Sequence, residues 1–453
     1  MIKVLCLNPP YKVKVVREGR CQHESAIWDT LYPPMGLATI AAVARSVGSD
    51  VKLLDAVALG MTGPSALKHV QAFDPNWIVA SLSTPTMESD LTFLAQAKSV
   101  SNCKTAVFGA HVSHAAAELL LHPGIDVAIR HDPEPCIPYL IQDKVSEAPN
   151  ATWKREDDIV KNETVWMDLD FLPVPAWDLV DLSPYRIPIR QSPYVLVATG
   201  RGCPHRCCFC VVPQHYGRHP RLRSVPHVLK ELESVQDRVK DVFFHTDTFT
   251  LRSDYVTDLC QGIRDSRLDL RWVCNSRVDT LDEKLANIMK DAGCWMVSFG
   301  LESGVQEVLA AANKSITPDQ SRAAVRAAKA AGLLTVGHFV LGLPGETEET
   351  LRKTLHFSRT VGIDFAEFYL ATPFPGSALY ETFQEKLGKD WHAYRYDNSL
   401  LRQDLPLNRA RKMGYLRFYL RPTHMAKLMA VFGITSLPRL FGAGLRFLKG
   451  TMS

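Results

Sequence analysis

The stretch that most constrains this chain is Thr199-Gly200-Arg201-Gly202-Cys203-Pro204-His205-Arg206-Cys207-Cys208-Phe209-Cys210. Three of its cysteines have the spacing C-x3-C-x2-C, and the stretch overlaps the end of the apolar run YVLVATG. Thiolates are soft ligands, which favours an iron–sulfur cluster or zinc over magnesium or calcium. A purely structural site takes four protein ligands, so three leave one metal position open. The pattern therefore predicts a metal site on Cys203, Cys207 and Cys210 with room for a substrate or cofactor.

Other residues of this loop leave alternatives open. Cys208 lies between the predicted ligands and is expected to be a bystander, although the spacing also permits an exchange with Cys207. A zinc site would need a fourth ligand, which Cys208 or His205 would supply. Gly200 and Gly202 allow the backbone to fold tightly around a metal centre.

A series of strands and helices follows the loop. Apolar runs from residue 194 onward predict six strands, each followed by a helix or loop, which indicates a parallel barrel or partial barrel over residues 193–385. Active residues of such folds lie at the carboxyl ends of the strands. Polar segments stand at four of these ends: His245-Thr246-Asp247-Thr248, Asn275-Ser276-Arg277, Gly300-Leu301-Glu302-Ser303-Gly304 and Ala371-Thr372-Pro373.

Residues 1–145 alternate short β-branched runs with helical patterns, which is typical of a doubly wound α/β unit around a parallel sheet. Ligands of such sheets bind at the carboxyl ends of the strands. The candidate binding edge therefore consists of four loops: Asn8-Pro9-Pro10, Ser83-Thr84-Pro85-Thr86, Gly109-Ala110-His111 and Arg130-His131-Asp132.

Two further segments differ from the units beside them. Residues 146–192 are charged and then rich in proline, so we predict a linker. Residues 386–453 end in Leu, Phe and Met interleaved with Arg and Lys, which predicts a helical, basic amphipathic region. This region is expected either to contact a membrane surface peripherally or to dock on the barrel as a helical cap.

Composition narrows the class of protein. A chain of 453 residues accommodates about two or three folded units. The net charge of +4 is not concentrated in one run, so no nucleic-acid partner is expected. The start MIKVLCLNPP lacks the pattern of a signal peptide, and we expect a cytoplasmic protein, with membrane association as the alternative. Cysteines in apolar stretches are expected to be buried free thiols, namely Cys6, Cys103, Cys260, Cys274 and Cys294.

The cysteine loop at the start of a βα series resembles that of the radical S-adenosylmethionine (SAM) superfamily. The resemblance implies a [4Fe–4S] cluster on Cys203, Cys207 and Cys210, with SAM chelating the fourth iron. A fifth-strand segment, Gly337 to Glu346, resembles the part of the family that packs along the adenosine. The SAM contacts that the resemblance implies are Phe209, Asp247, Thr248, Arg277, Glu302, Gly342 and Thr372. For the charged residues among them, a salt bridge at the barrel mouth is the alternative.

The first unit resembles the cobalamin-binding domain of one radical SAM subclass. The implied cobalamin contacts are Pro10, Ser83, Thr84, Thr86, Gly109, His111 and Glu134. The D-x-H-x-x-G motif of other cobalamin proteins is not present in this sequence, so the resemblance supplies no lower cobalt ligand. His111 and His114 are alternatively exposed loop histidines.

The overall resemblance is to the group around the anaerobic magnesium-protoporphyrin monomethyl ester cyclase and hopanoid-modifying enzymes. Some members of that group do not transfer methyl. The cobalamin-binding resemblance implies methylation of an unactivated carbon of a small biosynthetic intermediate, with a flavodoxin or ferredoxin as electron donor, and the basic, apolar tail favours a hydrophobic intermediate. Three alternatives are a cyclase or other rearranging enzyme without methyl transfer, a tRNA methylthiotransferase, and a non-enzymatic sensor. The methylthiotransferase family has additional cluster cysteines and an RNA-binding domain that this sequence does not show.

Overall fold

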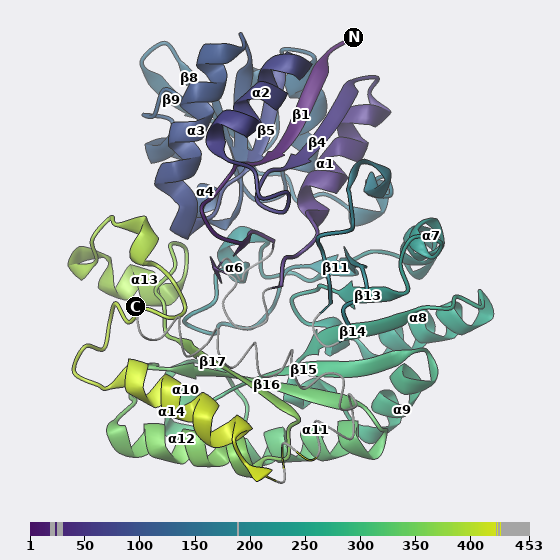
Figure 1. The fold of residues 1–453 in the computed structure, drawn as a ribbon, viewed down its shortest axis with the longest axis vertical. Coiled ribbons are helices and arrows are strands. Elements are labelled where there is room, and N and C mark those ends of the chain that lie inside the picture. The colour runs from purple at the N-terminus through teal and green to yellow at the C-terminus, as the bar shows by residue number, and fades with distance from the viewer. Residues whose placement is uncertain (19–22, 25–29, 188–189, 423, 425, 427–453) are drawn as a thin grey trace.

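The computed structural model describes residues 1–18, 23–24, 30–187, 190–422, 424 and 426. Within them the chain forms two α/β units, one above the other in Figure 1, with α6 and the β11–β12 hairpin at their junction. The carboxyl ends of the N-terminal strands point toward the barrel, so both candidate binding edges meet at this junction.

The N-terminal unit is a seven-stranded sheet of order β4-β1-β5-β6-β7-β8-β9, in which the first five strands are parallel. The strands are β1 (Lys3–Asn8), β4 (Asp50–Asp55), β5 (Trp77–Ser81), β6 (Lys104–Phe108), β7 (Val127–Ile129), β8 (Ala151–Arg155) and β9 (Asp158–Lys161). The strand order reverses at β1, which makes the loops after β1 and β5 the topological switch point where ligands bind in such sheets.

Helices cover both faces of this sheet. Alternate residues of β1 point to opposite faces, so Val4 and Cys6 enter one core while Leu5 and Leu7 enter the other. The first core packs under α1 (Met35–Ser46) and α5 (Ile137–Ile141). The second packs under α2 (Gly63–Phe73), α3 (Met87–Val100) and α4 (Ala110–Leu119). The predicted doubly wound unit is confirmed.

The second unit is a six-stranded, fully parallel partial barrel of order β10-β13-β14-β15-β16-β17. Its strands are β10 (Tyr194–Val197), β13 (Asp241–Phe244), β14 (Arg271–Ser276), β15 (Cys294–Glu302), β16 (Leu334–Leu341) and β17 (Phe365–Leu370). The helices between them are α7 (Val225–Val235), α8 (Ser253–Asp265), α9 (Glu283–Asp291), α10 (Gln306–Ala311), α11 (Pro318–Ala330) and α12 (Glu348–Thr360). The six predicted strands are all present.

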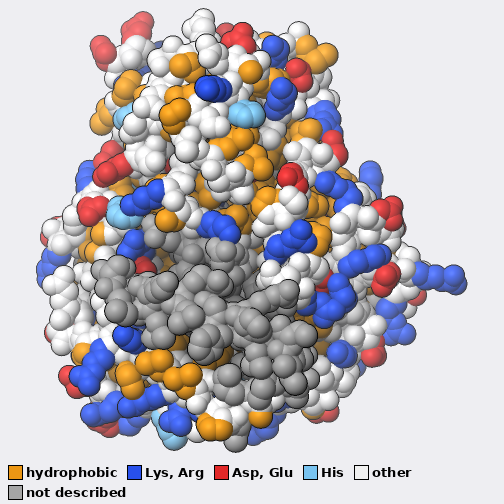
Figure 2. All heavy atoms as spheres, viewed as in Figure 1, with side chains coloured by type: hydrophobic (Ala, Val, Ile, Leu, Met, Phe, Trp, Pro, Cys, Tyr) orange, Lys and Arg blue, Asp and Glu red, His pale blue; other side chains and the backbone are white. Residues whose placement is uncertain are grey.

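Smaller elements complete the described fold. They are the hairpins β2 (Val15–Val16) with β3 (His23–Glu24) and β11 (Gly200–Arg201) with β12 (Arg221–Leu222), and the short helices α6 (Val212–His215) and α13 (Ala378–Phe383). On the face shown in Figure 2, basic and acidic side chains are interspersed. No helix of the described residues is long and apolar enough to cross a membrane.

The predicted linker needs correction at its start, because β8 and β9 fall within residues 146–192 and extend the N-terminal sheet by two antiparallel strands. Their outer residues are charged and exposed, as is common at a sheet edge. Because of these charged residues, the segment resembled a loop in composition. The following segment packs into the cores of both units through Leu169 and Trp177.

The C-terminal region is helical where it is described. Helix α14 (Leu407–Tyr419) docks on the barrel, burying Phe418 completely and donating a hydrogen bond from the Tyr415 hydroxyl to Glu367 at 2.8 Å. Residues 427–453 of the predicted amphipathic region lie outside the described residues. Docking therefore accounts for α14, and membrane contact by the remainder stays a prediction.

Candidate active site

The cysteine loop is closed at its base by the β11–β12 hairpin. The backbone N–H of Cys203 donates to Gly217 at 3.2 Å, and that of Cys210 donates to Cys207 at 3.1 Å. Gly202 has φ +92°, and a Cβ there would lie 2.6 Å from the carbonyl oxygen of His219. The predicted need for glycine in this loop follows from both the backbone conformation and the close approach.

The three predicted ligands line one cavity of about 350 Å³ in the barrel mouth. Val16, Thr30 and Tyr32 of the N-terminal unit also line it. Cys208 does not line this cavity and packs instead among apolar residues that include Val308 and Leu343. The structure thus directs Cys207, and not Cys208, toward the cavity.

The donor chemistry of the loop fits an iron–sulfur cluster, whose iron corners take one thiolate each. No three His, Cys, Asp or Glu side chains of the described residues converge on a single-ion position. Burial raises the pKa of Cys207, and the charges of Lys314 and Arg277 act in the opposite direction. His205 also lines the cavity, and its Nε2 is buried without a hydrogen-bond partner among the described residues.

Five of the predicted SAM contacts line the same cavity: Phe209, Asp247, Thr248, Arg277 and Glu302. Asp247 accepts a hydrogen bond from the Gly202 N–H at 3.0 Å, which ties the second barrel strand to the cysteine loop. The Thr248 hydroxyl lies 3.8 Å from the sulfur of Cys203. Arg277 pairs with Asp279 at 2.8 Å, as the salt-bridge alternative expects, and still faces the cavity.

Gly342 and Thr372 are placed differently, since neither lines the cavity. Gly342 has φ +90° and lies against the α14 residue Leu407, only 2.6 Å from the position of an added Cβ. The Thr372 hydroxyl donates to the carbonyl of Arg395 at 2.9 Å and is almost fully buried. Both residues hold strand ends against the C-terminal segment, and their contact with SAM stays a prediction.

The predicted cobalamin contacts meet at the carboxyl edge of the N-terminal sheet. Ser83 and Thr86 share a hydrogen bond of 2.7 Å, and His111 Nδ1 lies 3.2 Å from the Thr84 hydroxyl. His111 is buried beneath Trp391, with ring centroids 4.7 Å apart, so it is not an exposed loop histidine. Burial lowers its pKa to about 3, which keeps the imidazole neutral. Pro10 is buried in the loop after β1.

Sequence reasoning missed the charged residues under this edge. Arg17 forms a buried pair with Asp90 at 2.5 and 2.8 Å and also donates to the Thr86 hydroxyl at 3.0 Å. Asn8 donates to Asp55 at 2.9 Å, and its Oδ1 is buried without a partner among the described residues. This acceptor and the hydroxyl groups at the switch point suit a ligand that carries amide side chains, as a corrin does.

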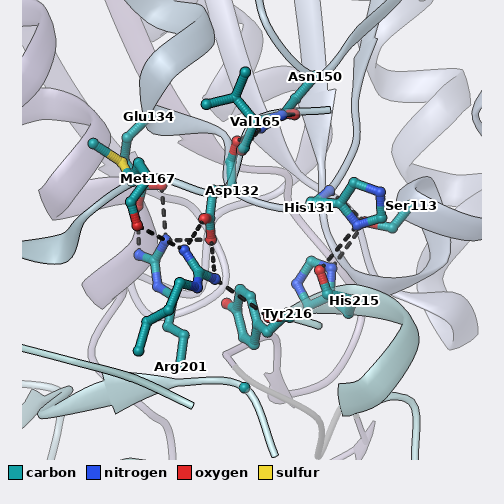
Figure 3. Close-up of polar contacts among 12 residues, drawn as sticks. Ser113, His131, Asp132, Glu134, Asn150, Val165, Met167, Arg201, His215 and Tyr216 are labelled. Atoms are coloured by element: carbon teal, nitrogen blue, oxygen red, sulfur yellow. Dashed lines mark hydrogen bonds and ion pairs between the residues drawn. The ribbon is translucent and has the colours of Figure 1, made fainter. Parts of the chain in front are cut away.

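Glu134, a predicted cobalamin contact, is also bound to the cysteine loop. Both of its carboxylate oxygens accept hydrogen bonds from the Arg201 guanidinium, at 2.9 and 2.5 Å. Asp132 binds Arg201 at 2.9 Å and also binds Arg221, and Figure 3 shows Asp132 and Glu134 directed at Arg201. Burial opposes ionisation of Asp132, but the two guanidinium groups lower its pKa below the usual value.

The far wall of the cavity carries polar and aromatic groups that the motifs did not indicate. His338 Nδ1 lies 3.2 Å from the Tyr369 hydroxyl, and their rings are stacked. The same wall includes Glu367, Arg395, Tyr396, Arg411 and Tyr415. The alternation of side chains along β16 and β17 could have indicated which strand residues face the cavity. The cavity residues from the C-terminal region could be identified only from the structure.

Comparison with known proteins accounts for both units. Residues 197–358 match the radical SAM superfamily, and residues 29–138 match the B12 binding domain. An uncharacterised methyltransferase of Pyrococcus horikoshii is 31% identical over 94% of this chain and 94% of its own length. The chain belongs to the cobalamin-dependent radical SAM enzymes. As a member, it uses a [4Fe–4S] cluster, SAM and cobalamin, and its chemistry requires a substrate and a reductant.

Two further relatives show the range of this family. The cytidylyl-2-hydroxyethylphosphonate methyltransferase of Streptomyces wedmorensis is 25% identical over 83% of this chain and 80% of its own. The anaerobic magnesium-protoporphyrin IX monomethyl ester cyclase of Rubrivivax gelatinosus is 26% identical over 82% and 70% of the two chains.

Solved structures show the same fold. The radical SAM methyltransferase TsrM of Kitasatospora setae, with cobalamin and a [4Fe–4S] cluster bound, aligns with a TM-score of 0.70 at 19% identity over 85% of this chain and 75% of its own. The cobalamin-dependent radical enzyme OxsB aligns with a TM-score of 0.74 at 14% identity over 97% and 71% of the two chains.

Proposed function

We propose that this radical SAM enzyme transfers a methyl group to an unactivated carbon of a small molecule. The observation that carries the proposal is one cavity shared by Cys203, Cys207, Cys210 and five predicted SAM contacts. Thr30 and Tyr32, from the segment that matches the B12 binding domain, line the same cavity. The Pyrococcus horikoshii and Streptomyces wedmorensis relatives are methyltransferases by name, which supports methyl transfer over other outcomes.

In this proposal the three cysteines hold the cluster and the charged residues above them bind SAM. Glu302 pairs with the amino group of SAM in place of Lys314, and Arg277 pairs with its carboxylate, because each offers the opposite charge. Phe209 packs beside the ligand, and Asp247 holds the loop through Gly202. When bound, the cluster and SAM supply a 5′-deoxyadenosyl radical and cobalamin supplies a methyl group.

The N-terminal edge holds cobalamin in this proposal. Ser83, Thr84 and Thr86 present hydroxyl groups at the switch point, while Pro10 and Gly109 shape the loops on either side. Gly109 has φ +137°, and a Cβ there would lie 2.5 Å from the Leu82 carbonyl oxygen, so the loop after β6 requires glycine. Neutral His111 supports Thr84 from below.

The substrate is proposed to lie between the cysteine loop and the wall that carries His338 and Tyr369. Apolar and aromatic residues of that wall, among them Val336, Phe374 and Tyr396, suit a substrate with an apolar carbon framework. Exclusion of water from this cavity once the ligands are bound would protect a radical from side reactions. A flavodoxin or ferredoxin is the proposed electron donor.

Product ratios test the proposal. The full-length protein is reconstituted anaerobically with iron, sulfide and cobalamin, then reduced and supplied with SAM and candidate substrates. Methyl transfer predicts equimolar S-adenosylhomocysteine and 5′-deoxyadenosine together with a methylated product. Formation of 5′-deoxyadenosine and a modified substrate without S-adenosylhomocysteine would reject methyl transfer and favour a cyclase or rearrangement, as in the Rubrivivax gelatinosus relative.

A further inference from the structure

The cysteine loop has two ends, and each end is attached to the N-terminal unit. At the base of the loop, Arg201 of β11 and Arg221 of β12 both bind Asp132, which therefore spans the hairpin. Arg201 also binds Glu134 at 2.5 Å. Arg201 stands two residues before Cys203, so these carboxylates fix the backbone that leads into the first predicted ligand.

The other end of the loop is held by hydroxyl and imidazole groups. Helix α6 begins two residues after Cys210 and ends at His215, whose Nδ1 lies 2.8 Å from the Ser113 hydroxyl of α4. The Ser113 hydroxyl also accepts from the backbone N–H of His131 at 2.8 Å. His131 in turn places its Nδ1 3.1 Å from the His215 carbonyl oxygen. Figure 3 shows both sets of contacts side by side.

These contacts come from two loops of the candidate cobalamin edge. Ser113 lies in the first turn of α4 after Gly109, and residues 131–134 follow β7. Asp132 and Glu134 are 0% and 1% exposed, and the Arg201 side chain is 10% exposed. Buried charged partners hold one another in place more strictly than surface pairs do, because a separated charge would remain without solvent.

We propose that Asp132, Glu134 and Ser113 are positioning residues that couple cobalamin occupancy to the geometry of the cluster loop. The inference rests on the proposed cofactor sites. It adds a positioning role for Glu134, which would act on the cluster loop through Arg201 and not only by contact with cobalamin. Coupling between two sites is reciprocal, so an assembled cluster changes the affinity for cobalamin by the same factor that cobalamin changes the stability of the cluster.

Cobalamin titration of the full-length protein tests this coupling. Hydroxocobalamin is titrated anaerobically into cluster-loaded and cluster-free protein, and the ratio of the two dissociation constants is the coupling. We expect a ratio of at least about five for the wild type, the lower end of typical couplings. Glu134→Gln should bring the ratio close to one while iron content and the spectrum of the reduced cluster remain measurable.

A matched control is Glu118→Gln, which removes a carboxylate of α4 that pairs with Lys389 at 2.7 Å but is half exposed. It should keep the wild-type ratio. Ser113→Ala removes only the hydroxyl contacts and should also lower the ratio of the two dissociation constants. It therefore tests the inference even if Glu134→Gln does not fold.

Two results would overturn the inference: a wild-type ratio near one, or an unchanged ratio in both Glu134→Gln and Ser113→Ala. A wild-type protein that takes up neither a cluster nor cobalamin is a different result, because it would overturn the proposed function and the inference with it.

Discussion

The Lys314 ammonium lies 2.7 Å from the Glu302 carboxylate in the barrel cavity, and both side chains are less than 9% exposed. Glu302 ends β15 with φ +61°, and Lys314 follows α10. The Lys314 carbonyl oxygen also accepts from Arg277 at 3.1 Å. One buried group of charges thus links two proposed SAM-binding residues to a lysine that no motif indicated.

Glu302→Gln should weaken SAM binding, because it leaves Lys314 without a charged partner and removes the proposed partner of the SAM amino group. A hydrogen bond to a charged group contributes about 1.5–3 kcal/mol, so we expect a loss of affinity of about 10- to 100-fold. The measurement is a SAM titration monitored by the spectrum of the reduced cluster. The control Glu349→Gln changes an exposed carboxylate on α12 and should bind SAM normally. Wild-type affinity in Glu302→Gln would contradict the assignment.

Gly109→Ala should release cobalamin, since an added Cβ would meet the Leu82 carbonyl oxygen at 2.5 Å. Backbone strain at such a position is of order 1–3 kcal/mol, and displacement of the loop adds to it. Gly48→Ala is the control, because Gly48 also has a positive φ of +84° but no atoms within 4 Å of the added Cβ. Cobalamin retained after gel filtration should fall in Gly109→Ala alone. Equal retention in the two variants would show that the loop after β6 does not shape the site.

Glu18→Gln should change how stability depends on pH. Burial raises the pKa of Glu18 from 4.5 to about 8, and its carboxylate oxygens accept from the Gly36 N–H at 3.1 and 3.3 Å. The folded state therefore holds a proton that the unfolded state releases, so the stabilisation is complete at low pH and is lost as pH rises through about 8. The loss is on the order of a few kcal/mol.

Thermal unfolding across pH measures this effect. Compared with the wild type, Glu18→Gln should gain several degrees in Tm at about pH 8.5 and change little at about pH 5, because glutamine keeps an acceptor without a proton to lose. Parallel Tm curves for the two proteins over this range would contradict the assignment.

The cysteine loop and its glycines were predictable because their chemistry is local in sequence: spacing indicates the ligands, and Gly202 meets backbone only 15 to 17 residues away, as at Gly217 and His219. The free buried thiols Cys6, Cys103, Cys260, Cys274 and Cys294 were predictable from their apolar surroundings, and all five are buried. The parallel strands of both sheets also followed from patterning, since these strands are apolar runs between helices.

Residues that depend on distant partners were not predictable. Arg17 meets Asp90 across 73 residues of sequence, and Trp391 covers His111 across 280. Gly342 and Thr372 lie near cavity residues in sequence, yet they contact Leu407 of α14 and the Arg395 carbonyl oxygen and do not line the cavity. The charged strands β8 and β9 resemble a loop in composition because their outer face is exposed.

The most direct test of the account compares cluster assembly and SAM cleavage in the wild type, Cys203→Ala and Cys208→Ala. Cys203 faces the cavity, whereas Cys208 packs among apolar side chains outside it. After anaerobic reconstitution and reduction, the wild type and Cys208→Ala should hold iron and sulfide and form 5′-deoxyadenosine, and Cys203→Ala should lose the cluster absorbance and all cleavage. Continued cleavage by Cys203→Ala, or none by the wild type, would contradict the account.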